Sequence, residues 1–188
     1  MELERRWWKE CVFYQIYPRS FQDSNGDGIG DLRGIIDRVD YLADLGIGGI
    51  WLGPVFESPG DDMGYDISDY QKILDIFGTM EDWEELRDKL HSRGIRILVD
   101  LVVNHTSDEH EWARRARAGE GEYMSRYFFT DDQGLIDRYT RDVPQVFPTT
   151  APGHFTYLPE LGQSVMTQFY PYQWDLNYRN PRVFNEMM

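Results

Sequence analysis

The sequence predicts an α/β fold in which a parallel sheet is covered by helices. Three apolar runs, at residues 12–17, 47–52 and 95–103, have the length and the β-branched content of strands. Apolar residues at helical spacing follow the first run and again the second. The runs are nearly continuously apolar rather than alternating, which is typical of parallel strands packed against helices.

The first strand, at 12–17, is stopped by Pro18, because proline has no N–H to offer a sheet. A polar, glycine-rich loop follows at 23–31. Asp31 can cap the next helix, and Gly46 can end it. We therefore expect one helix over 32–45, with its buried face formed by Leu32, Ile35, Ile36, Val39, Leu42 and Leu45.

The second strand, at 47–52, leads through a long loop to a second helix. Thr79 followed by Asp82 three residues later predicts a capping box at the start of that helix, and Gly94 follows its end. The third strand, at 95–103, is expected to be buried on both faces. Its carboxyl end carries polar residues, and in barrels of alternating strands and helices that end is where chemistry takes place.

The alternation of predicted strands and helices stops after the third strand. Residues 106–172 contain one short helical piece and are otherwise rich in proline, glycine and aromatic residues, which predicts a small inserted domain. We therefore divide the chain into residues 1–105, the first three strand–helix units, residues 106–172, the insertion, and residues 173–188, the return. Asn180 and Pro181 begin a helix that shows no end signal before Met188, so we expect a truncated chain.

Composition excludes several classes of function. A net charge of −14 argues against nucleic acid and against an anionic membrane surface, because both need a basic footprint. A single cysteine allows no internal disulfide, and no run approaches the roughly 20 apolar residues of a membrane span. We expect a cytoplasmic protein with no nucleic-acid or membrane partner.

The loop at 23–31 places oxygen-bearing side chains at alternate positions, which is the first part of a calcium loop of the EF-hand kind. The twelfth position is Gly34, so the bidentate glutamate is missing, and a solvated acidic turn is the alternative. We expect a structural Ca²⁺, or Mg²⁺, at this loop. Its ligands would be Asp23, Asn25, Asp27, the carbonyl oxygen of Ile29, and Asp31.

Three side chains are expected to converge where the strands end. Asp62 and Tyr65 lie in the loop after the second strand, and His105 follows the third. Together they would offer a carboxylate to sugar hydroxyls, a flat ring for stacking, and an imidazole donor. Asp66 and Asp69 are expected to brace the loop. The pattern predicts a substrate-binding rim.

Five segments together resemble the α-amylase superfamily (glycoside hydrolase family 13) of retaining α-glycosidases and transglycosylases. Residues 100–105, Asp-Leu-Val-Val-Asn-His, match its signature at the end of strand three, and 46–54 resemble its strand-two signature. Residues 23–35 and 62–70 are similar to the α-glucosidase and oligo-1,6-glucosidase branch. Gln-Trp-Asp-Leu-Asn at 173–177 resembles the signature that closes the inserted domain.

The resemblance implies the N-terminal part of a (β/α)8 TIM barrel, strands one to three, with the small inserted domain after strand three. Asp62, Tyr65 and His105 would then bind the non-reducing glucose, and Asp100 would support a catalytic arginine. The family's nucleophilic Asp and acid/base Glu follow later strands. We therefore expect no catalytic residue before Met188 and no activity from these residues alone.

The implied function is retaining cleavage of α-glucosidic bonds in oligosaccharides. The closing signature usually has proline where this chain has Trp174, and the run 169–178 looks more like amylosucrase-type enzymes. Sucrose-driven glucosyl transfer is therefore an alternative, with sucrose in place of an α-glucoside oligosaccharide as the substrate. A non-catalytic relative of the family is a further alternative, and the intact Asp62, Tyr65 and His105 count against it.

Overall fold

The computed structural model describes residues 5–188, which form two compact units. Among the described residues, the first unit comprises 5–57 and Tyr70–Leu101, and the second comprises Ser58–Asp69 and Val102–Met188. Each unit has its own hydrophobic core. The loop after the second strand therefore belongs to the unit that also contains the C-terminal half of the chain.

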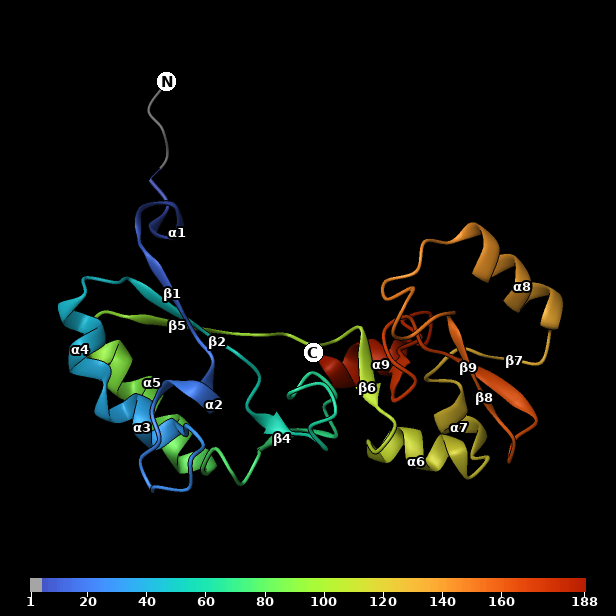
Figure 1. The fold of residues 1–188 in the computed structure, drawn as a ribbon, viewed down its shortest axis with the longest axis horizontal. Helices are drawn as coiled ribbons and strands as arrows, with labels where there is room; N and C mark the ends of the chain where they lie inside the picture. The colour runs from blue at the N-terminus through green and yellow to red at the C-terminus, as the bar shows by residue number, and fades with distance from the viewer. Residues whose placement is uncertain (1–4) are drawn as a thin grey trace. The chain divides into compact units, whose positions relative to one another are not determined.

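A three-stranded parallel sheet forms the centre of the first unit (Figure 1). Its strands are β1 (Phe13–Ile16), β2 (Gly49–Leu52) and β5 (Arg96–Val99), in the order β1-β2-β5. In the register, Ile16 pairs with Leu52, and Leu52 pairs with Val99. The predicted parallel α/β arrangement is confirmed.

Helices cover one face of this sheet. The expected single helix over 32–45 is instead two, α3 (Leu32–Asp37) and α4 (Val39–Asp44), because Arg38 leaves helical geometry at φ −104° and ψ 6°. The third covering helix is α5 (Met80–Ser92), and it begins with the predicted capping box. Packing of these helices on β1 and β2 buries an entirely apolar core that includes Leu32, Ile35, Leu42, Leu86, Leu90, Ile16, Ile50 and Leu52.

The other face of the sheet is open in the described residues. Trp51 and Leu98, which are register partners on that face, are 42% and 39% exposed. The expectation that the third strand is buried on both faces is therefore wrong. Leu98 on one face of β5 and Val99 on the other are 39% and 41% exposed, and among residues 5–188 no strand pairs with its far edge. The shorter elements near this unit are α1 (Trp7–Glu10), α2 (Pro18–Phe21) and the pair β3 (Phe56–Glu57) and β4 (Asp69–Ile73).

The third strand is also shorter than predicted. It ends at Val99, and a separate strand, β6 (His105–Ser107), pairs antiparallel with β10 (Gln173–Asp175). Hydrogen bonding to the return of the chain, not to the parallel sheet, thus fixes His105. The other elements of the second unit are α6 (Glu111–Arg117), α7 (Gly121–Met124), β7 (Phe129–Thr130), α8 (Gln133–Asp142), β8 (Phe155–Leu158), β9 (Gln163–Met166) and α9 (Pro181–Met187).

Trp174 lies at the centre of the second core and is fully buried. Tyr127 and Phe129 meet its ring edge-on, with centroids at 5.4 and 5.8 Å. The guanidinium of Arg117 lies over the same ring at 5.2 Å. Trp174, which stands where the closing signature usually has proline, therefore packs in the core, and its side chain is shielded from solvent.

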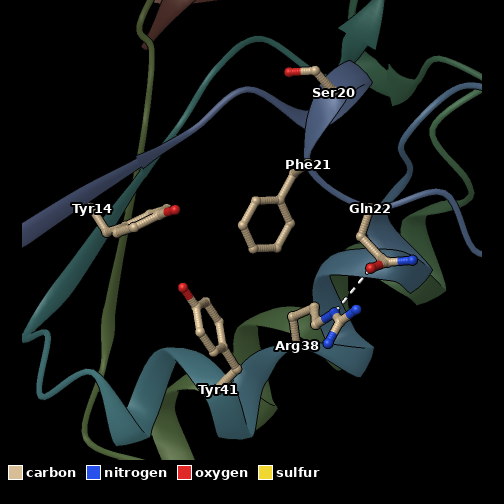
Figure 2. Close-up of a pocket in the computed structure, with 6 residues that line it drawn as sticks. All are labelled: Tyr14, Ser20, Phe21, Gln22, Arg38 and Tyr41. Atoms are coloured by element: carbon tan, nitrogen blue, oxygen red, sulfur yellow. Dashed lines mark hydrogen bonds between the residues drawn. The ribbon is translucent and has the colours of Figure 1, made fainter.

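The first unit also has an open hollow of about 320 Å³ beside β1, α2 and α4, and its lining residue Gln22 directly precedes the loop at 23–31 (Figure 2). The hydroxyl groups of Tyr14 and Tyr41 point into it, and Arg38 Nε donates to Gln22 Oε1 at 2.9 Å on its wall. Among residues 5–188, no helix is both long and apolar enough to cross a membrane.

Candidate functional site

The loop at 58–66 is held in shape by Asp66, which is fully buried. Its carboxylate accepts a hydrogen bond from Ser58 Oγ at 2.8 Å and from the backbone N–H groups of Asp61 and Asp62 at 3.0 and 3.1 Å. A buried carboxylate is stable when donors surround it in this way. The predicted bracing role of Asp66 is confirmed.

The same loop carries an unusual backbone conformation. Met63 has φ 53°, the one positive φ outside glycine among the described residues, and Gly64 follows at φ 104°. The N–H of Tyr65 donates to the carbonyl oxygen of Asp62 at 3.0 Å and closes the turn. Left-handed conformations are uncommon for residues with side chains and cluster at functional sites. The turn sets Asp62 and Tyr65 on either side of it.

His105 is 5% exposed and has protein atoms at both ring nitrogens. Nε2 lies 3.0 Å from the carbonyl oxygen of Tyr65, and Nδ1 lies 3.2 Å from Asn104 Nδ2. Burial lowers the pKa of His105, against the opposing effect of the Tyr65 carbonyl and of nearby Asp62. The imidazole is therefore neutral at pH 7.

Two residues outside the predicted set complete this side of the site. Gln173 is fully buried, and its Nε2 donates to Asp62 Oδ2 at 2.9 Å. The ring of Phe169 packs against the imidazole of His105, with centroids 5.1 Å apart. Both belong to the segment that ends in the closing signature, so that signature was the signal that could have found them.

An aromatic stack extends from this point. Phe147 packs against Phe169, and Tyr170 stacks on Phe147 at 4.8 Å and on Tyr172 at 5.2 Å. The Tyr172 hydroxyl donates to the carbonyl oxygen of Asp61 at 3.3 Å. Burial, followed by the neighbouring carboxylates, raises the pKa of Tyr172 to about 12. Flat rings beside carboxylate and amide groups are suited to a ligand with hydroxyl groups and apolar C–H faces.

The structure therefore brings Asp62, Tyr65 and His105 into one unit, around a loop held by a buried carboxylate. Their role in binding sugar stays a prediction. Asp100 lies in the other unit, where its Oδ1 accepts a hydrogen bond from Trp51 Nε1 at 2.7 Å across neighbouring strands. That indole was not part of the predicted set.

The loop at 23–31 lies in the first unit and folds on its own backbone. Asp23 accepts hydrogen bonds from three loop amides, at 2.7, 2.9 and 3.0 Å, and these bonds, Gly26 foremost, lower its pKa. Asn25 and Asp27 each accept the N–H two residues further on, at 2.9 and 2.8 Å. The alternation seen in the sequence is thus a series of side-chain turns.

Asp31 closes the loop and is 4% exposed. Its carboxylate accepts from Ser24 N and Oγ at 3.1 and 2.9 Å, and from Gly34 N at 2.6 Å, which confirms the predicted helix cap. Within residues 5–188, no group of three or more His, Cys, Asp or Glu side chains gathers as a metal site. The oxygen donors suit a hard cation, and the metal assignment stays a prediction.

The missing twelfth ligand has a steric cause. A Cβ on Gly34 would lie 2.0 Å from the carbonyl oxygen of Gln22, far inside contact distance. No glutamate can occupy that position while α3 packs against this backbone. The loop therefore cannot supply the bidentate ligand of an EF-hand.

The parallel strands, their covering helices and the polar loops after them form the strand–helix arrangement of the (β/α)8 barrel class. The family model described as "Alpha amylase, catalytic domain" matches residues 15–188, so the chain belongs to the α-amylase family. This membership confirms the resemblance to that family and the expected (β/α)8 barrel relationship.

Three known proteins show the closeness of the match. The oligo-1,6-glucosidase of Parageobacillus thermoglucosidasius is 48% identical over 98% of this chain and 32% of its own length. The crystal structure of the isomaltulose synthase PalI from Klebsiella sp. LX3 is 42% identical with a TM-score of 0.90, over 98% of this chain and 33% of that one. A MutB mutant solved with its substrate sucrose is 41% identical with a TM-score of 0.87, over 98% and 33%. The chain spans about a third of the length of these relatives.

Proposed function

We propose that this chain forms the glucose-binding side of a retaining α-glucosidase that hydrolyses α-glucosidic bonds in oligosaccharides. The observation that carries the proposal is the placement of Asp62 in an ordered turn, hydrogen-bonded to buried Gln173 and adjacent to His105 and its aromatic neighbours. The 48% identity to an oligo-1,6-glucosidase supports the hydrolytic class.

The residues present would bind and orient one glucose unit. The carboxylate of Asp62 would accept hydrogen bonds from sugar hydroxyls, and the rings of Tyr65 and Phe169 would cover the apolar face of the sugar. A retaining mechanism also needs two carboxyl groups about 5–5.5 Å apart across the scissile bond. By family resemblance these follow later strands, so the carboxylates here bind and do not react.

A chimera tests the proposal. Residues 5–188 would replace the matching third of the Parageobacillus oligo-1,6-glucosidase, and release of p-nitrophenol from p-nitrophenyl α-glucoside would be measured. We expect turnover, and we expect Asp62→Asn to lower kcat/KM by about 10- to 100-fold, since a charged hydrogen bond contributes roughly 1.5–3 kcal/mol.

Asp61→Asn is the matched control, because Asp61 is the exposed neighbour and uses its backbone, not its side chain, in the contacts described. Equal loss from both variants, or a folded chimera without turnover, would overturn the proposal. The second outcome would instead favour the non-catalytic relative. Glucose release by the 188-residue chain alone would overturn the assignment of the catalytic carboxylates to later strands.

A sucrose-using glucosyltransferase is the second candidate. The MutB complex with sucrose and the isomaltulose synthase structure favour it. Supplying the chimera with sucrose or isomaltose as sole substrate separates the two candidates. Hydrolysis of isomaltose without formation of new disaccharide from sucrose supports the glucosidase. A cytoplasmic location is part of the same proposal.

We also propose that the loop at 23–31 binds Ca²⁺ or Mg²⁺ as a structural ion. Asp23, Asn25, Asp27, Asp31 and the Ile29 carbonyl would supply oxygen ligands, and binding would require the three carboxylates to draw together. The melting temperature of the chain should rise in millimolar Ca²⁺ and return in chelator. Asp27→Ala should remove that rise, and an unchanged melting temperature in both solutions would refute the site.

A further inference from the structure

The closing signature places an acid directly opposite the candidate sugar-binding histidine. Asp175 of β10 and His105 of β6 are register partners in the antiparallel pair. Asp175 is 6% exposed and His105 is 5% exposed. Burial raises the pKa of Asp175 to about 6, against the lowering effect of the donors that face its carboxylate.

Two donors hold that carboxylate. The backbone N–H of Gln168 donates to Oδ2 at 2.6 Å, and the side-chain amide of Asn104 donates from Nδ2 to Oδ1 at 3.0 Å. The same Asn104 nitrogen lies 3.2 Å from Nδ1 of His105. Asn104 thus bridges the two buried groups from an exposed position.

The chemistry of the groups fixes every hydrogen in this chain of contacts. An ionised carboxylate only accepts, so the NH₂ of Asn104, and not its oxygen, must face Asp175. Its second hydrogen then points at Nδ1 of His105, which must be the unprotonated nitrogen. Nε2 consequently carries the hydrogen and donates it to the carbonyl oxygen of Tyr65 at 3.0 Å.

We propose that Asp175 is a positioning residue that fixes, through the amide of Asn104, the neutral Nε2–H tautomer of His105. An exposed amide can otherwise turn over, and its oxygen would then select the Nδ1–H tautomer and leave two acceptors facing each other at Tyr65. That the Nε2–H group matters for sugar recognition rests on the proposed function. The tautomer assignment itself does not.

The surrounding charges agree with this assignment. Asp62 and Asp66 act on His105 from the turn, and both favour its protonation, whereas burial is the larger effect and opposes it. Fully buried His154 also acts on Asp175 and favours its ionised form. Its Nδ1 lies 2.8 Å from the Gln168 side-chain oxygen. The imidazole of His105 therefore stays neutral, and the carboxylate of Asp175 stays charged.

The test is nitrogen NMR of the ¹⁵N-labelled 188-residue chain, in which the ring nitrogens of His105 report the tautomer directly. In the unmodified chain we expect Nδ1 unprotonated and Nε2 protonated. In Asp175→Asn the ratio of Nδ1–H to Nε2–H should rise at least about fivefold, the factor that one ordinary hydrogen bond supplies. Asn104→Ala, which keeps the buried acid, should produce a shift in the same direction.

Asp108→Asn is the matched control. Asp108 is a half-buried acid of the same unit, and its carboxylate pairs with Arg117 at 3.1 Å. An unchanged tautomer in both Asp175→Asn and Asn104→Ala would overturn the proposal, as would equal changes in Asp108→Asn. Movement of the Asn104 side-chain resonances on addition of Ca²⁺ would also overturn it, because the acid would then hold a cation.

The NMR measurement is made without any sugar, so it does not depend on the proposed function. A chimera that fails to hydrolyse glucosides while the tautomer follows Asp175 would therefore refute the proposed function and leave the positioning role intact. In an active chimera, Asp175→Asn should lower kcat/KM for p-nitrophenyl α-glucoside, with the Asp108→Asn chimera unchanged.

Discussion

The two units differ in what they bury. Among the described residues, the buried side chains of the first unit are apolar with the single exception of Asp31. The second unit buries polar groups throughout. They are Ser58, Asp66, His105, Thr106, Ser107, His110, Arg126, His154, Ser164, Thr167, Gln173 and Asp175.

This difference separates a scaffold from a site. Apolar burial is non-directional and tolerates exchange of similar volumes. Buried polar groups need specific partners, and they are costly when one partner is lost. The first unit should therefore respond to volume and the second to charge, hydrogen bonding and pH.

Loss of Asp66 should have the largest effect. Asp66→Ala leaves Ser58 Oγ and the N–H groups of Asp61 and Asp62 without their acceptor. We expect a loss of about 4 kcal/mol in the free energy of unfolding of the second unit. Urea unfolding followed by hydrogen exchange measures it, and Asp61→Ala should change stability by less than about 1 kcal/mol. Comparable losses would show that Asp66 is not the anchor.

Leu86→Ala is the matching change in the first unit. Leu86 is fully buried in the apolar core, so we expect a loss of about 3 kcal/mol. The loss should be the same at pH 4 and pH 7, because no titrating group lies in that core. A pH-dependent loss would contradict the division between the units.

His110 should make the second unit sensitive to acid. Its Nδ1 accepts the N–H of Trp112 at 3.1 Å as the cap of α6, and burial lowers its pKa to about 4. Since the folded pKa is below the unfolded value of 6.5, stability is lost as pH falls from about 6.5 to 4, by at most about 3 kcal/mol. His110→Asn keeps a capping side chain and should remove this loss.

Asp175 acts with the opposite sign over nearly the same range. Its folded pKa of about 6 lies above the ordinary 3.8, so stability rises as pH falls from about 6 to 4. The two contributions offset each other in the unmodified chain. Asp175→Asn should therefore expose the acid sensitivity from His110, and unfolding curves at pH 4, 5 and 6 would show it. A flat profile in that variant would refute one of the two assignments.

Asp31→Ala should have the smallest effect. It removes the cap of α3 and the acceptor for Ser24, and we expect a loss of about 1–2 kcal/mol in the first unit. Asp31→Asn should recover most of that loss, because asparagine also caps helices well. Thermal unfolding at pH 7 measures both, and equal losses would mean that the charge, not the cap, matters.

The sequence was most informative where structure is local. The caps at Asp31 and Asn180 and the capping box at Thr79 depend on neighbours within a few residues, and all three are present. The parallel strands followed from their apolar runs. The turn carrying Asp62 was found by its motif, and the bracing by Asp66 was expected.

What was missed depends on distant partners or on an apolar repeat too short to stand out in the sequence. The pairing of β6 with β10 joins segments about seventy residues apart, and no local pattern in 105–107 announces it. Gln173 contacts Asp62 across 111 residues. Helix α8 has its apolar residues Leu135, Ile136 and Tyr139 at helical spacing, but the repeat covers little more than one turn of a ten-residue stretch that is otherwise polar. The break at Arg38 likewise has no signal in the apolar spacing.

The pairing of β6 with β10 has a consequence for engineering. The segment from 108 to 172 begins after β6 and ends before β10. These two antiparallel strands hold its ends side by side, and we call the pair the stem. Segments with neighbouring ends tolerate exchange and changes of length. A one-residue slip within the stem would instead turn His105 and Asp175 to the opposite face. The segment can therefore be swapped between homologues as a cassette, provided that both stem strands are transferred unchanged.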